Sequence, residues 1–61
     1  MKHFMSKTQQ FGAYHFNKGE QVFLRAVKGT DNFILSKRRS QPVGPTVSRE
    51  WLRELVTSEE D

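Results

Sequence analysis

The sequence contains no cysteine. Without thiols the chain has no disulfide framework and no thiolate metal site, which fits a reducing compartment. It also lacks an apolar run long enough to span a bilayer, and its first ten residues lack the apolar stretch of a signal peptide. We therefore expect a cytoplasmic protein that has no membrane partner.

Groups suited to catalysis are also scarce. His3 and His15 are the only imidazoles, and no paired carboxylates, nucleophile motif, glycine-rich phosphate loop or metal-ligand spacing accompanies them. A lone histidine on an expected strand, such as His15, is most often a structural or surface residue. We therefore expect no enzymatic activity, no cofactor and no bound metal.

The chain has 61 residues, which is enough for one domain with a small core. A domain of this size is marginally stable unless a partner or a second copy adds buried surface. Its charge is uneven: residues 1–39 hold eight cations and two anions, a net charge of +6, whereas residues 40–61 hold two cations and five anions, a net charge of −3. This asymmetry favours a polyanionic partner on the first part of the chain.

The clearest pattern is a β-hairpin over residues 20–38. Two runs of β-branched and aromatic residues flank Gly29–Asn32, which has the residue types of a tight turn. Because side chains alternate along a strand, Val22, Leu24 and Ala26 share one apolar face, which we expect to face the core.

The turn also predicts the register of the hairpin. If residues 29–32 form the loop, Ala26 pairs with Leu35 and Lys28 with Phe33, and both partners on the second strand face the core. The outer face then mixes aromatic, aliphatic and basic side chains: Phe23, Arg25, Val27, Ile34, Ser36 and Arg38.

Residues 11–16 alternate in an aromatic-rich pattern and predict a first strand, joined to the hairpin by Asn17–Gly19. With that three-residue loop, Tyr14 lies opposite Val22 and faces the core. A two-residue loop would instead bury Phe11, Ala13 and His15. We favour the longer loop because Gly19 then occupies a position that requires positive φ.

The rest of the chain predicts a connector and a helix. Two prolines and a glycine in residues 37–45 disfavour regular structure. A helix is expected over residues 48–58, with Ser48 as its cap and an apolar stripe made of Trp51, Leu52, Leu55 and Val56. Trp51 is expected to pack on the sheet, so that its replacement by alanine costs about 3 to 5 kcal/mol.

These elements predict an α+β fold, a small three-stranded antiparallel β-meander packed against one C-terminal α-helix (βββα), with an SH3-like curved sheet as a variant of the same three strands. Residues 1–10 are expected to form a flexible basic N-terminal arm, residues 11–57 the single domain and residues 58–61 an acidic tail.

Nucleic-acid binding is the function that the outer face favours, because clustered cations neutralise phosphates and exposed aromatic rings stack on bases. The candidate binding residues combine both kinds of side chain: Phe23, Arg25, Lys28, Lys37, Arg38 and Arg39. DNA is slightly favoured over RNA, because a sheet backed by a helix can lay its strands in a major groove.

Two other functions use the same surface. A small regulator or inhibitor would bind a larger protein through an apolar patch at Phe23, Val27 and Ile34, with the arginines at its rim. A homodimer would bury that patch and supply the missing core.

Overall fold

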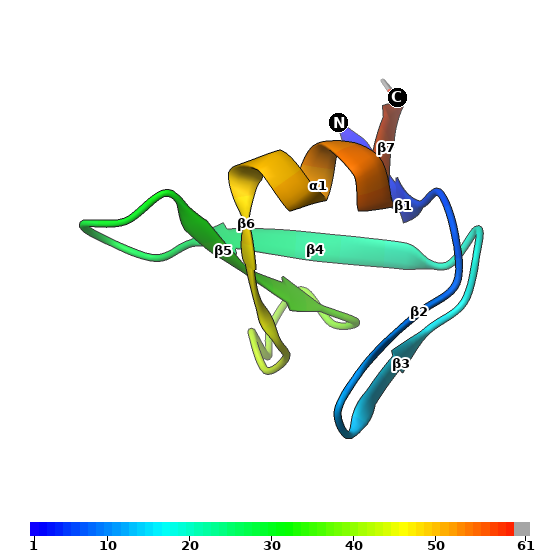
Figure 1. Ribbon diagram of the computed structural model, residues 1–61, viewed down its shortest axis with the longest axis horizontal. Coiled ribbons are helices and arrows are strands. Elements are labelled where there is room, and N and C mark those ends of the chain that lie inside the picture. Colours follow the sequence, from blue (N-terminus) through cyan, green and yellow to red (C-terminus); the bar gives the residue numbers. More distant parts are fainter. Residues whose placement is uncertain (60–61) are drawn as a thin grey trace.

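Seven short strands and one helix make up residues 1–59, the part of the chain that the computed structural model describes (Figure 1). In chain order the elements are β1 (Lys2–Met5), β2 (Gln9–Phe11), β3 (Tyr14–Phe16), β4 (Gln21–Ala26), β5 (Asn32–Ser36), β6 (Thr46–Ser48), α1 (Arg49–Leu55) and β7 (Val56–Glu59). Five strands form an antiparallel sheet in the order β6-β5-β4-β1-β7, and β2 pairs with β3 in a separate two-stranded sheet.

The expected three-stranded meander with one helix is therefore wrong. The structure is mostly β. The SH3-like variant is wrong for the same reason, because it assumed the same three strands. Three of the additional strands, β1, β6 and β7, are only three or four residues long and carry too few apolar residues to show an alternating pattern. Pairing with neighbouring strands, more than an alternating pattern of their own, makes them strands.

The predicted hairpin is present as β4 and β5, but its register differs. Leu24 pairs with Leu35 and Ala26 with Phe33, because the loop comprises residues 28–31 instead of 29–32. The loop is closed at Val27, whose carbonyl accepts hydrogen bonds from the Thr30 amide at 3.2 Å and the Thr30 hydroxyl at 2.9 Å. A shift of two positions keeps each side chain on its expected face.

The segment expected as a flexible arm contains a central strand instead. β1 lies between β4 and β7, with His3 opposite both Val22 and Ser58. Met5, at the end of this strand, is only 2% exposed and belongs to the core. The predicted acidic tail also begins differently, because Ser58 and Glu59 lie in β7; its last two residues are outside the described part of the chain.

Residues 11–16 do not form one strand paired with β4. The chain reverses at Gly12, and Tyr14 pairs with Phe11 within the β2–β3 hairpin. Tyr14 is consequently 39% exposed instead of buried, and His3 takes the expected place of Tyr14 opposite Val22. The predicted hairpin loop at Asn17–Gly19 is wrong, because β3 and β4 do not pair, but the expected positive φ of Gly19 is confirmed at 87°.

The helix is shorter than expected, with seven residues. Its cap is confirmed, because the Trp51 amide donates to Ser48 Oγ at 3.3 Å. It ends where β-branched Val56 and Thr57 begin β7, since pairing with β1 stabilises an extended chain there. Within residues 1–59, the structure contains no helix with the length and apolar character needed to cross a membrane.

The core lies between the sheet, α1 and the β2–β3 hairpin. Its buried apolar residues come from most elements: Met5, Phe16, Val22, Leu35, Val47, Leu52 and Leu55. Trp51 is not among them, so the prediction that Trp51 packs on the sheet as a buried residue is wrong. It is 39% exposed and meets the edge of Phe11 at a ring-centroid distance of 5.1 Å.

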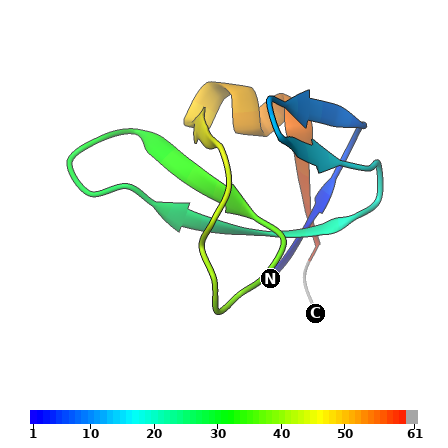
Figure 2. The same ribbon diagram turned by 90° about the horizontal axis from the view of Figure 1, so that it is seen from below.

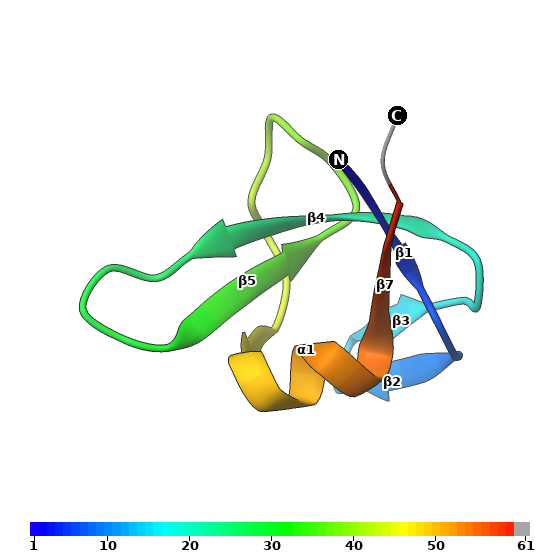
Figure 3. The same ribbon diagram turned by 90° about the horizontal axis from the view of Figure 1, so that it is seen from above.

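The two hairpin loops point to opposite ends of the molecule, with the β4–β5 loop at one end and the β2–β3 hairpin at the other (Figures 1 and 2). The connection between β5 and β6 passes on the side of β4 that is opposite α1 (Figures 1 and 3). This connection follows directly from β5 and carries three of the predicted site residues, so its path determines where they lie.

Candidate nucleic-acid interface

The outer face of β4 carries the two strand residues of the predicted site. Phe23 is half-buried and stands opposite Ser36, while Arg25 is exposed and stands opposite Ile34. The alternation that directs Val22 into the core thus presents an aromatic ring and a guanidinium two residues apart on the other face.

A hollow of about 270 Å³, the Phe23 hollow, opens beside this face. Phe23, Arg25 and Arg39 line it, together with His3, Leu24, Ser36 and Pro42. It brings Phe23 together with two arginines, one from β4 and one from the β5–β6 connection. Such a combination can stack on a planar group and neutralise an anion beside it.

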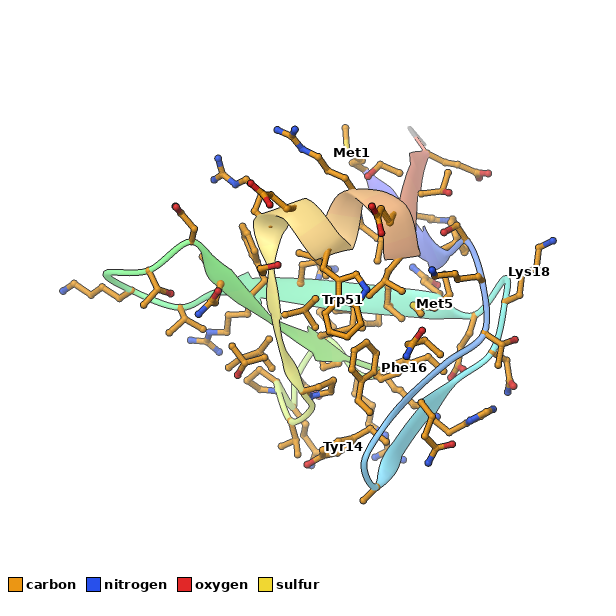
Figure 4. The ribbon with its side chains drawn as sticks, viewed as in Figure 1. Met1, Met5, Tyr14, Phe16, Lys18 and Trp51 are labelled. Carbon is orange, nitrogen blue, oxygen red and sulfur yellow. The ribbon has the colours of Figure 1, made fainter. Side chains whose placement is uncertain are left out.

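A second hollow of about 200 Å³, the Tyr14 hollow, lies between the β2–β3 hairpin and the β5–β6 connection. It is lined by Tyr14, Phe16, Lys37, Arg38, Gln41 and Val43. Figure 4 shows Trp51, Phe16 and Tyr14 following one another from α1 toward the tip of the hairpin. The exposed ring of Tyr14 makes this a second aromatic site with cations at its edge.

Residues 37–43, which we call the basic ridge, separate the two hollows. Ser36 anchors the start of the ridge, because its buried hydroxyl lies 3.0 Å from the carbonyl oxygen of Arg38 and 3.3 Å from that of Phe23. Lys37 is held in place as well: its Nζ lies 3.5 Å from Glu20 Oε2 and 5.3 Å from the centroid of the Phe16 ring.

The arginines of the site remain available for a ligand. In the described part of the chain, Arg25, Arg38 and Arg39 are exposed and none of them forms an ion pair. Guanidinium groups left unpaired at a surface can each donate two hydrogen bonds to a phosphate in bidentate geometry.

The structure therefore divides the predicted site into three places. Phe23, Arg25 and Arg39 come together at the Phe23 hollow, and Lys37 and Arg38 at the Tyr14 hollow. Lys28 is exposed in the β4–β5 loop and lines neither hollow.

Eight of the residues that line these hollows were not among the predicted site residues, and four of them show why. His3 belonged to a segment expected to be flexible, Tyr14 was expected in the core, and Pro42 and Val43 belonged to a connector with no periodic pattern. Only the aromatic character of Tyr14 was a signal of a binding role, and it equally suits a buried strand residue.

Another hollow, of about 410 Å³, lies between β1, β7 and the loop before β4. Its charged lining residues are Lys18 and Glu59, one of each sign, so it offers no excess positive charge to a polyanion. Among residues 1–59, no three histidine, aspartate or glutamate side chains gather in a way that could hold a metal ion.

Comparison of this chain with protein-family models, with curated proteins and with solved structures finds no match. The features of this structure that bear on function are the two hollows and the basic ridge between them.

Proposed function

We propose that this chain is a small, non-enzymatic nucleic-acid-binding module of the cytoplasm. The observation that supports the proposal most is the juxtaposition of Phe23 with Arg25 and Arg39 at one hollow. Phosphate contacts supply most of the affinity of such proteins, and aromatic stacking adds contacts to bases. The predicted slight preference for DNA over RNA stays a prediction.

A regulator of a larger protein is the alternative. That function needs a continuous apolar patch at Phe23, Val27 and Ile34, yet Arg25 is the direct cross-strand partner of Ile34 and interrupts the patch. The charge at its centre favours an anionic ligand over an apolar one.

A mobility-shift titration tests the proposal. Duplex DNA, single-stranded DNA and RNA of one sequence are titrated at about 50 mM and about 200 mM salt. We expect binding that weakens at the higher salt, and Arg39→Gln should weaken it at both. Arg53→Gln is the matched control, because Arg53 is exposed on α1 and lines neither hollow.

Absence of binding to all three probes would contradict the proposal. A protein ligand that depends on Phe23 and Ile34 but is unaffected by Arg39→Gln would favour the alternative. The mass of the free chain in solution, measured in the same buffer, tests the homodimer hypothesis, because self-association doubles it.

A further inference from the structure

Successive residues of the basic ridge face two different hollows. Lys37 and Arg38 line the Tyr14 hollow, whereas Arg39 lines the Phe23 hollow. The same division continues along the ridge, with Pro42 at the Phe23 hollow and Val43 at the Tyr14 hollow. Three consecutive cations therefore stand between two separate aromatic sites.

Each hollow presents an aromatic side chain on a firm support. Tyr14 is 39% exposed beside the fully buried Phe16, and Phe23 is a half-buried residue of the central strand β4. Volumes of about 200 and 270 Å³ leave room for a flat ring system in each. Unstacked nucleobases bind proteins by stacking on such aromatic side chains.

The ridge itself is fixed at both ends. At the first end, the Ser36 hydroxyl donates a hydrogen bond to the Arg38 carbonyl. Two residues after the other end, the Pro45 carbonyl accepts a hydrogen bond from the Leu35 amide at 3.0 Å. Gly44 packs so closely on the Leu35 carbonyl that a side chain there would overlap it. A site held in place before binding loses less entropy when it binds.

From this arrangement we propose that the ligand is a single strand of nucleic acid that crosses the basic ridge. Its phosphates contact Arg38 and Arg39, and bases on the two sides of the ridge stack on Tyr14 and Phe23. The inference rests on the proposed nucleic-acid binding and specifies its substrate class. A duplex fits poorly, because its bases are stacked on each other and enter a hollow only after unpairing.

Fluorescence anisotropy with a labelled single strand of about 16 nucleotides, and with the duplex of the same sequence, tests the inference. We expect the single strand to bind at least about tenfold more tightly than the duplex. Tyr14→Leu and Phe23→Leu, which keep an apolar side chain but remove the ring, should each weaken single-strand binding by about tenfold and leave duplex binding unchanged.

Trp51→Leu is the matched control. Trp51 has the same exposed fraction as Tyr14, 39%, but lines neither hollow, so its replacement should leave the affinity unchanged. Circular dichroism of each variant confirms that it is folded before its affinity is compared.

Equal or tighter binding of the duplex, with both aromatic variants neutral, would overturn the single-strand inference and leave the proposed function standing. Binding of neither probe would overturn both. Displacement of the single strand by polyglutamate at equal charge concentration would also overturn the inference, because the site would then recognise charge without bases.

Discussion

Leu55 and Trp51 lie on the same short helix but differ in what they contribute to the core. Leu55 is fully buried, while Trp51 stands at the flank of the apolar stripe and contacts Phe11. We expect Leu55→Ala to lower the free energy of unfolding by about 2 to 5 kcal/mol, and Trp51→Ala to lower it by less. Urea denaturation of the two variants measures the difference. A larger loss for Trp51→Ala would contradict a core that contains Leu55 and leaves Trp51 at its flank.

Ser48 stabilises the start of α1 through the hydrogen bond that its hydroxyl accepts from the Trp51 amide. Ser48→Ala removes that acceptor, and we expect the free energy of unfolding to fall by about 1 kcal/mol. Ser48→Asp, which keeps an acceptor and adds a charge favourable at a helix N-terminus, should retain the wild-type value. Thermal unfolding followed by circular dichroism compares the three proteins, and equal stability of Ser48→Ala and wild type would contradict the role of the cap.

The connection from β5 to β6 depends on Gly44. A Cβ atom at this position would overlap the carbonyl oxygen of Leu35 in β5, the strand to which the following residue, Pro45, is hydrogen-bonded. We expect Gly44→Ala to destabilise the fold by about 1 to 3 kcal/mol and to weaken single-strand binding, because the basic ridge would have to move. Val43→Ala, at a neighbouring position that is 66% exposed, is the control for stability. Denaturant titration that finds the two variants equally stable would contradict the close contact.

At the level of elements, the sequence predicts what is encoded locally. The existence of the β4–β5 hairpin, the Ser48 cap and the positive φ of Gly19 each depend on a few neighbouring residues, and these three are confirmed. Strand β1 was missed because Phe4 and Met5 are its only large apolar residues, and it becomes a strand only between β4 and β7. Val56 was expected in the helix for a similar reason. It is a strand residue because it pairs with Met5, and the residues next to Val56 in the sequence do not indicate that pairing.

The candidate site was predictable in part. Alternation along β4 correctly places Phe23 and Arg25 on the outer face, and because the register error was an even number of residues, Ile34 and Ser36 also lie on that face. The division of Lys37, Arg38 and Arg39 between two hollows was not predictable, since it depends on how an irregular segment folds back over the sheet.

For the whole molecule, the distribution of charge matters more than the net charge of +3. The basic ridge and the adjacent Arg25 hold only cations, whereas α1 holds two cations and two anions and lies on the other side of β4 (Figure 3). A polyanion that approaches the molecule is therefore attracted to the ridge side, and this attraction weakens as salt screens it.

The salt dependence of single-strand affinity tests this account most directly. If Arg38 and Arg39 each neutralise one phosphate, the logarithm of the association constant should fall with the logarithm of salt concentration with a slope of about −1.4. Arg39→Gln should make the slope shallower by about 0.7, whereas Arg53→Gln should leave it unchanged. An affinity that does not change with salt, or the same slope for wild type and Arg39→Gln, would contradict the account.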